Sequence, residues 1–324
     1  MQAVSHPQQV CGRGGFQKTR TCSIVGPMGD PTDLTPTNPI PADLGIVDTM
    51  LGIPDGNREE WYQFLKPQLR DKESQHEFEF PAQYMFKEVP EDPDTDDPVA
   101  WVLEQMDRWG IAQALIGTSG AHSRALADHA DRFIGCAAVD PNRGMDAVRD
   151  LKTAVLEHGC KAAQWFPAGS NPQVPINDKK AYPIYAACVE LDIPIFVCAG
   201  VPGPRVPMAC QHVELIDEVC WFFPELKFVM RHGAEPWTDL AVKLMIKWPN
   251  LYYSTSAFAP RYYPKAIVDY ANTRGADKVI YAGYFPMGLS LDRIMTELPG
   301  VGFKDDVWPK FLRHNARKVL KLDD

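Results

Sequence analysis

The sequence lacks a long apolar run: no stretch approaches about 18 consecutive apolar residues, the length that a membrane-spanning helix requires. The N-terminal segment MQAVSHPQQVCGRGG also lacks the apolar region of a secretory signal peptide. We therefore expect neither a membrane partner nor a secretory route. The composition, 45% hydrophobic and 23% charged, is ordinary for a globular protein.

Clusters of basic residues are absent as well. The chain carries a net charge of −9 and contains no Lys/Arg-rich run, which argues against nucleic acid as a partner. An acidic balance favours solubility and says little about the substrate.

The cysteines form no close-pair motif. Most of them stand inside apolar runs, which indicates reduced, buried thiols in a cytoplasmic protein. The eight cysteines are Cys11, Cys22, Cys136, Cys160, Cys188, Cys198, Cys210 and Cys220.

The N-terminal region differs in composition from the remainder of the chain. Residues 1–43 are rich in Pro, Gly, Thr and Gln and show few periodic apolar positions. We interpret them as an irregular arm that either wraps a neighbouring subunit or is loose. The folded domain is expected over residues 44–324, beginning at the apolar run LGIVD.

Eight short, β-prone apolar runs follow one another along this domain. They are mostly continuous rather than alternating, which is typical of parallel strands covered on both faces. The runs comprise residues 44–48, 112–117, 133–140, 160–166, 194–200, 227–233, 251–257 and 278–286.

Helical patterns separate these runs. In residues 144–158 apolar side chains recur at helical spacing, and Gly159 follows as a stop signal. Pro236 stands at an expected first helical position. Further helices are expected at residues 182–191, 213–223, 236–247, 264–273, 291–298 and 305–320.

A strand followed by a helix, repeated along the whole domain, predicts an α/β fold, the closed (β/α)8 TIM barrel. The rival is a doubly wound open sheet. The sequence contains neither G-x-G-x-x-G after the first run nor G-x-x-x-x-G-K-[ST], which disfavours the nucleotide-binding versions of that rival.

An insertion of residues 54–100 separates the first two predicted strands. It carries the aromatic segments WY, HEFEF and QYMF, followed by an acidic run with prolines. Because loops after barrel strands build the active site, the insertion is expected to form a lid or wall. The equal alternative is a subunit interface, which leads us to expect a homo-oligomer.

Functional residues of a barrel concentrate at the C-terminal ends of its strands. The predicted strand ends therefore provide the candidate site residues. They are Asp48, Thr118, Ser119, Asp140, Gln164, Cys198, His232, Ser254 and Tyr284.

Four segments give the chain a family resemblance: FVMRHGAEPW, YYSTSAFAPRYYP, VIYAGYFP and WPKFLRHNARKVLKL. They resemble the second amidohydrolase family, whose members include metal-dependent hydrolases and aromatic-acid decarboxylases. The resemblance covers roughly residues 44–322 and includes a C-terminal K-x-x-x-x-N-A-x-x-[VL] pattern. It implies the barrel fold and an enzymatic activity.

The chain departs from this family at the metal ligands. Met50 and Gly52 stand where the family's D-x-H-x-H motif has two histidines. Cys198 replaces the metal-binding histidine of the fifth strand, and Tyr284 replaces the metal-binding aspartate of the eighth. His232, which the family uses as a general acid or base, is kept.

These replacements predict a branch of the family without a metal and without another cofactor. A catalytic zinc ion needs about three converging N, O or S ligands, and a thioether and a glycine cannot replace two imidazoles. The alternative is a soft ion held by Cys198 and His232, with Asp48 as a third ligand.

Without a metal, a side chain must activate water. His232 is the leading general base because an imidazole has an ordinary pKa of about 6.5; its alternative is a hydrogen-bonded core residue. Asp48 either orients an imidazole, takes a proton, or caps a loop. Cys198 is either a nucleophilic thiolate or an inert buried thiol. Arg231 is expected to point outward, because it precedes His232 and strand side chains alternate.

The predicted substrate-binding residues surround these groups. Met50, Trp165 and Tyr284 provide walls that fit a flat ring. Gln164 and Tyr284 offer donors for developing negative charge, and Ser254 completes the predicted set. Both Gln164 and Tyr284 have the alternative of serving only as pocket wall.

We therefore expect a hydrolase that directs water at an electron-poor ring carbon or C–N bond of a small aromatic or heterocyclic compound. The leaving group is an amine, an alkoxide or nitrite. The motifs also resemble a branch lacking the metal ligands, for which denitration of a nitroimidazole is the implied reaction. The alternatives are an aromatic-acid decarboxylase or lyase, disfavoured because the family's decarboxylases use the metal, and a barrel that binds ligand without turnover.

Overall fold

The computed structural model describes residues 40–322 apart from residues 42, 57 and 77–79. Most of the predicted N-terminal arm, with Cys11 and Cys22, lies outside the described residues. Within the described residues, none of the helices combines the length and the apolar character needed to cross a membrane.

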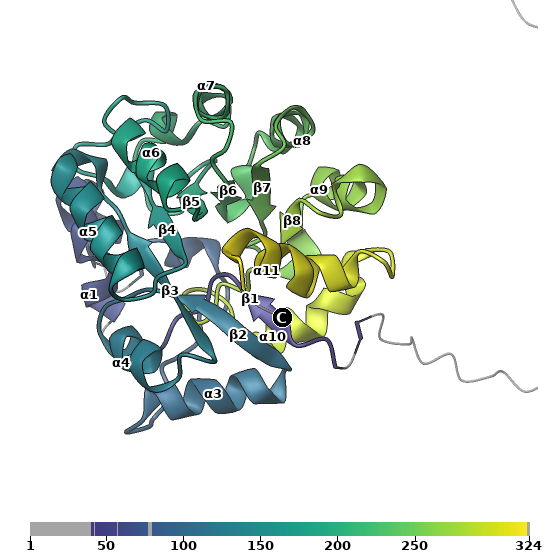
Figure 1. The fold of residues 1–324 in the computed structure, drawn as a ribbon. Helices are drawn as coiled ribbons and strands as arrows, with labels where there is room; N and C mark the ends of the chain where they lie inside the picture. The colour runs from purple at the N-terminus through teal and green to yellow at the C-terminus, as the bar shows by residue number, and fades with distance from the viewer. Residues whose placement is uncertain (1–39, 42, 57, 77–79, 323–324) are drawn as a thin grey trace, which may run out of the picture. The chain divides into compact units, whose positions relative to one another are not determined.

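Eight parallel strands curl into a barrel, which confirms the predicted (β/α)8 fold (Figure 1). Neighbours in the sheet follow the order of the chain. The first and last strands meet where the Thr49 amide donates to the Tyr281 carbonyl at 3.2 Å and the Gly52 amide donates to the Phe285 carbonyl at 2.7 Å. The strands are β1 (Ile46–Asp48), β2 (Ile111–Ile116), β3 (Phe133–Ala138), β4 (Ala162–Trp165), β5 (Ile195–Cys198), β6 (Phe228–Arg231), β7 (Leu251–Ser254) and β8 (Val279–Ile280).

Helices lie around the outside of the barrel, across one of its ends and in the insertion between the first two strands (Figure 1). They are α1 (Arg58–Tyr62), α2 (Lys72–His76), α3 (Pro98–Arg108), α4 (Ala121–Asp128), α5 (Met145–Leu156), α6 (Tyr182–Glu190), α7 (Leu215–Phe222), α8 (Thr238–Lys247), α9 (Lys265–Tyr270), α10 (Leu291–Glu297) and α11 (Asn315–Leu320).

The predicted helices agree with these elements except at some ends. Helix α8 begins at Thr238, so the prediction that Pro236 opens this helix is wrong. Trp237 lies between them with φ −92° and ψ 34°, which is not a helical conformation. The last predicted helix is divided, because a π-helical turn at Lys310–His314 precedes α11.

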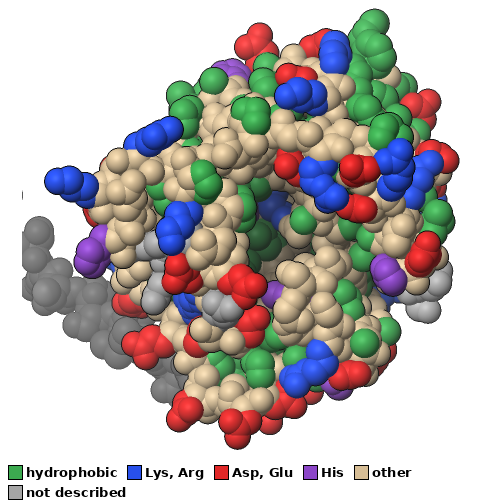
Figure 2. Space-filling model, turned by 90° about the vertical axis from the view of Figure 1, so that its left-hand side faces the viewer, with side chains coloured by type: hydrophobic (Ala, Val, Ile, Leu, Met, Phe, Trp, Pro, Cys, Tyr) green, Lys and Arg blue, Asp and Glu red, His purple; other side chains and the backbone are tan. Residues whose placement is uncertain are grey.

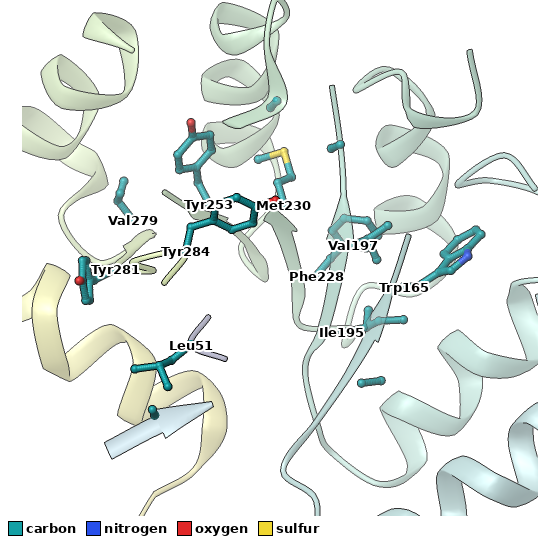
Figure 3. Close-up of a cluster of buried hydrophobic side chains, with 14 of the residues drawn as sticks. Leu51, Trp165, Ile195, Val197, Phe228, Met230, Tyr253, Val279, Tyr281 and Tyr284 are labelled. Atoms are coloured by element: carbon teal, nitrogen blue, oxygen red, sulfur yellow. The ribbon is translucent and has the colours of Figure 1, made fainter. Parts of the chain in front are cut away.

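Strand alternation divides the apolar core into two layers. Side chains inside the barrel form one layer, closed below by Ala316, Val319 and Leu320 of α11. The alternate side chains, including Phe228, Met230, Tyr253 and Tyr281, face the helices and form the larger layer (Figure 3). Each large apolar side chain buried in this way contributes about 1.5–3 kcal/mol to stability. The inner layer comprises Val47, Leu115, Ile134, Cys136, Ala162, Phe196, Val229, Tyr252 and Ile280.

The insertion between β1 and β2 is tied to the loop that follows β5. The Tyr84 hydroxyl donates to the Gly203 carbonyl at 2.7 Å. Arg205 donates to both Asp71 and Glu73 at 2.8 Å, and its guanidinium lies 4.4 Å from the ring centre of Tyr84. These contacts hold the insertion across the C-terminal end of the barrel.

Candidate active site

A cavity of about 1120 Å³ opens at the C-terminal ends of the strands. Figure 2 shows one face of the molecule hollowed at its centre, with hydrophobic and basic side chains visible inside. Side chains from the insertion form part of its wall, among them Trp61, Tyr62, Phe80 and Phe86. The insertion is therefore a wall of the pocket, as one of the two sequence interpretations predicts.

The floor of the cavity consists of inward-facing residues that stand two positions after the inner core residues of their strands. Gln164 stands two residues after Ala162, and Arg231 stands two residues after Val229. Cys198 bears the same relation to the core residue Phe196. Because strand side chains repeat with a period of two, these three side chains point to the barrel interior, and all three line the cavity.

Arg231 corrects the prediction that it points outward. Its side chain is only 4% exposed, yet it lines the cavity. It donates to Gln164 Oε1 at 2.6 Å and to the Thr49 carbonyl at 3.5 Å. The prediction failed because strand β6 ends at Arg231: His232 has a φ of 65° and no longer follows the strand alternation.

His232 lies on the cavity wall with one ring nitrogen engaged. Its Nδ1 is 3.1 Å from the Ser256 hydroxyl, which also accepts the His232 backbone N–H at 3.1 Å. Its ring packs edge-on to Tyr284 with the ring centres 5.3 Å apart. Burial first, and the charge of Arg231 second, lower the pKa of His232 to about 3. The imidazole is therefore neutral near pH 7.

Cys198 is a buried thiol at the end of β5. Burial raises its pKa to about 12, although the nearby charge of Arg231 opposes that shift. A thiol with this pKa holds almost no thiolate near pH 7, and the thiolate is the nucleophilic form. The six cysteines among the described residues are all buried and unpaired with one another.

Asp48 faces away from the cavity. It lies between Val47 and Thr49, so alternation turns its carboxylate toward the helix side of the barrel. Its Oδ1 accepts the amides of Met50 and Gly283, each at 2.9 Å. Burial raises the pKa of Asp48 to about 7, while those two backbone hydrogen bonds lower it.

Gly283 is required beside that carboxylate. A Cβ atom at this position would lie 2.6 Å from Asp48 Oδ2, so no larger residue fits without a shift.

Ser254, like Asp48, does not line the cavity. It is fully buried, and its hydroxyl has no hydrogen-bond partner among the described residues.

The remaining predicted substrate-binding residues all line the cavity: Met50, Gln164, Trp165 and Tyr284. Trp165 is fixed by a hydrogen bond from its Nε1 to the Ser170 hydroxyl at 3.0 Å. Tyr284 stacks on Phe86 with ring centres 5.8 Å apart. The site thus has aromatic groups on two sides.

The sequence interpretation named Arg231 but gave it the wrong direction, and it missed other polar cavity residues, among them His122. His122 is structurally saturated, because its Nε2 accepts the Ile53 amide at 3.2 Å and its Nδ1 lies 3.0 Å from the Ser119 carbonyl. If the predicted strand had ended at Arg231 and not beyond it, the alternation of β6 would have turned Arg231 toward the cavity.

The residues present do not fit a divalent metal ion. Met50, Gly52, Cys198 and Tyr284 stand at the positions where the family resemblance implies ligands. Their donor atoms are a thioether, a protonated thiol and a phenol, which do not suit a hard or borderline divalent ion. Across the described part of the chain, no three His, Cys, Asp or Glu side chains converge in a way that would hold a metal.

The parallel barrel with a cavity at its strand ends places the chain in the class of TIM-barrel proteins. The Amidohydrolase family model matches residues 47–322, so the chain belongs to the amidohydrolase family, a family of enzymes. No curated protein sequence matches the chain.

Solved structures share the fold at low sequence identity. An uncharacterized TIM-barrel protein from Bordetella bronchiseptica has 19% identity and a TM-score of 0.65, covering 85% of this chain and 98% of its own. The 5-carboxyvanillate decarboxylase of Novosphingobium aromaticivorans, complexed with manganese and 4-hydroxy-3-methoxy-5-nitrobenzoic acid, has 17% identity and a TM-score of 0.61, covering 87% and 98%. The 4-oxalomesaconate hydratase of Rhodopseudomonas palustris has 18% identity and a TM-score of 0.56, covering 85% and 95%.

Proposed function

We propose that this chain is a metal-independent hydrolase that directs water at an electron-poor ring carbon of a small aromatic or heterocyclic compound. One observation carries the proposal: a neutral imidazole, that of His232, lines a cavity whose strand ends offer no set of metal ligands among the described residues. His232 is therefore the candidate base of this cavity, and its lowered pKa requires that it gain basicity as the reaction proceeds.

The reaction balances without a cofactor. The nitrogen of His232 that does not face Ser256 takes a proton from water as the water oxygen bonds to the ring carbon. The same carbon then releases nitrite, an amine or an alkoxide, and the imidazolium gives its proton to the leaving group or to solvent. Denitration of a nitroimidazole with release of nitrite is one form of this reaction.

The charge of Arg231 adjusts the basicity of His232 during this reaction. In the free site, burial and the Arg231 charge lower the pKa of His232. Negative charge that develops on the ring and its substituents next to Arg231 offsets that positive charge. The imidazole therefore becomes a better proton acceptor as attack proceeds.

The shape of the cavity supports a planar substrate. Tyr284, Phe86 and Trp61 contribute flat faces to the wall, and Gln164 with Arg231 contributes polar groups on the floor. Apolar walls with a few converging polar groups are typical of sites for small ring compounds.

Decarboxylation of an aromatic acid is the second candidate. Similar structures favour it, because one is an aromatic-acid decarboxylase bound to a nitrobenzoic acid and another is a hydratase, and none of the three is described as a hydrolase. In this reaction the ring carbon loses CO2 and gains a proton, so Arg231 would hold the carboxylate. The fold likeness at this identity does not decide between the two chemistries.

Isotope labelling separates the candidates. The full chain is incubated with 2-nitroimidazole, an aminopyrimidine and an ortho-hydroxybenzoate, in H2¹⁸O and separately in D2O, and products are analysed by mass spectrometry. Hydrolysis places ¹⁸O in a new ring hydroxyl and releases nitrite or ammonia. Decarboxylation places deuterium on the ring carbon and releases CO2.

The outcomes divide cleanly between three functions. We expect ¹⁸O incorporation that is lost in His232→Ala. Deuterium incorporation without ¹⁸O would show that the chain is a decarboxylase and not a hydrolase. Tight binding of ring compounds with neither label incorporated would mean that the barrel binds ligand without turnover.

A further inference from the structure

Arg231 is a buried cation that has no counterion among the described residues. Its side chain is 4% exposed, and in the part of the chain that the structure describes it forms no ion pair with a carboxylate at 4.0 Å or less. Its hydrogen-bond acceptors include Gln164 Oε1 and the Thr49 carbonyl, both neutral, and its Nε has no partner among the described residues.

The groups around the guanidinium are also uncharged. Burial raises the pKa of Cys136 to about 12 and that of Cys198 to about 12, so both remain thiols despite the attraction of Arg231. Burial and the Arg231 charge lower the pKa of His232 to about 3, so it remains a neutral imidazole. The ring of Phe196, 5.1 Å from the guanidinium carbon, offers only a weak cation–π contact.

A buried charge of this kind is costly unless a partner neutralises it. No carboxylate of the residues that the structure describes lies within 4.0 Å of Arg231, although Arg231 lines the cavity. Because Arg231 lines the cavity, its guanidinium is within reach of a ligand bound there. A ligand whose oxygens carry negative charge, full in a carboxylate and partial in a nitro group, offsets this cost on binding.

We propose that Arg231 and Gln164 form a binding site for a planar group with two oxygens, a carboxylate or a nitro group, carried by the ring of the substrate. The fork of a guanidinium matches two oxygens in one plane, which a point charge does not. This inference rests on the proposed function, because it names the substituent of the ring compound on which that function acts.

The site also accounts for the replaced metal ligands. In this chain Arg231 brings a cation from β6 into the cavity, which Met50, Gly52 and Tyr284 also line without adding a charge. A second, divalent cation in the same place would repel the guanidinium. Arg231 therefore supplies the positive charge of the pocket floor as a permanent part of the protein.

Binding of three matched probes tests the site. Sodium benzoate, nitrobenzene and toluene share one ring and differ only in the substituent, and their dissociation constants are measured on the full chain by titration calorimetry. We expect benzoate, nitrobenzene or both to bind about tenfold or more tightly than toluene, as a charge-assisted hydrogen bond allows. The tighter of the two identifies the carboxylate or the nitro group as the preferred substituent.

Substitution at the guanidinium locates the effect. Arg231→Met keeps the length of the side chain and removes the charge, so it should abolish the preference over toluene while toluene still binds. Arg231→Lys keeps the charge without the fork and should retain only part of the preference. Arg149→Met, on the exposed face of α5, makes the same change in net charge and should leave all three dissociation constants unchanged.

Two results would overturn the site. One is a wild-type protein that binds toluene as tightly as both other probes, a result that does not depend on the folding of any variant. The other is a folded Arg231→Met protein that keeps the full preference. Because none of the probes needs to react, a failure here leaves the labelling experiment for hydrolysis standing, and a failure of turnover leaves this binding result standing.

Discussion

The environment of His232 determines which chemistry its side chain can perform. The Ser256 hydroxyl forms hydrogen bonds with both the backbone amide and Nδ1 of His232, so one neighbour orients the ring. His232 also lines the cavity. Burial and the charge of Arg231 keep the ring neutral, which is the form that accepts a proton from water.

Replacing His232 by Ala should reduce turnover by about a hundredfold or more, because a general base contributes that much to water attack. The measurement is kcat for the compound that carries ¹⁸O in the labelling experiment. Toluene binding serves as the control for an intact cavity. A variant that binds toluene normally and turns over at close to the wild-type rate would remove His232 from the reaction.

Cys198→Ser should leave substantial activity. The raised pKa of the Cys198 thiol means that little thiolate is present near pH 7, and serine keeps a similar size and a hydroxyl donor at the same place. Steady-state kinetics of the variant and intact-mass spectrometry of the wild-type protein during turnover check this. Complete loss of activity, together with a covalent adduct on the native chain, would establish a thiolate mechanism instead.

Asp48 should make stability depend on pH in a predictable direction. Its pKa is raised to about 7 in the folded chain from 3.8, so the folded state holds a proton that the unfolded state has released between these values. Stability therefore falls as the pH rises from about 4 to about 7, and the full penalty is present above pH 7. The penalty grows by about 1.4 kcal/mol for each pH unit that separates the folded from the unfolded pKa.

Asp48→Asn should remove this penalty. The amide oxygen can still accept the amides of Met50 and Gly283, and no charge is buried at any pH. Thermal melts at pH 5 and pH 8 should show a larger gain in Tm at pH 8, whereas Asp146→Asn on exposed α5 should show no such difference. An equal effect of Asp48→Asn at both pH values would mean that the carboxylate is ionised throughout.

At the scale of the elements, the order of strands and helices was predictable because it is written in local patterns. Continuous apolar runs indicate buried parallel strands, and apolar residues at helical spacing indicate the covering helices. Helix α5, for example, lies within the predicted residues 144–158. The ends were less predictable: nothing in the sequence distinguishes Pro236 from a first helical residue, and the non-helical backbone of Trp237 decides the point.

The candidate site was predictable in part for the same reason. Strand alternation places Gln164 and Cys198 in the cavity, and it also turns Asp48 away, a consequence that the sequence already contains. Arg231 required the exact end of β6, which depends on the positive φ of His232. The insertion's packing over the mouth depends on contacts such as that between Tyr84 and Gly203, which no local pattern specifies.

Removing the tie between the insertion and the β5 loop should weaken ligand binding more than stability. Arg205→Ala deletes the contacts to Asp71 and Glu73 and the stacking on Tyr84. Exposed ion pairs contribute about 0–1 kcal/mol each, so Tm should change little. Hydrogen exchange should rise in α1 and α2 and the toluene dissociation constant should increase severalfold; Arg149→Met is the control, and unchanged exchange would show that the tie is dispensable.

At the scale of the whole molecule, the barrel and its chemistry are separable. Residues inside the barrel and between the strands and helices maintain the fold, and solved structures at 17–19% identity share it. The proposed chemistry depends instead on a few side chains of the cavity floor, which follow the inner core layer along the strands. Changing Arg231 or Gln164 alters the pocket floor while the apolar layers below remain intact.

This separation predicts how the whole protein responds to the removal of metal ions. Because the strand ends provide too few ligand atoms and already present the Arg231 cation, we expect the purified chain to contain substoichiometric Mn and Zn by mass spectrometry. Dialysis against a chelator should leave both kcat and Tm unchanged, and added Mn²⁺ or Zn²⁺ should raise neither. The same measurements on Cys198→Ser test the remaining soft-ion alternative, since any ion held through that sulfur would be lost from the variant. A contrary result would be one tightly bound ion per chain whose removal abolishes activity and whose return restores it. The mechanism would then depend on a metal and not on the imidazole and the guanidinium.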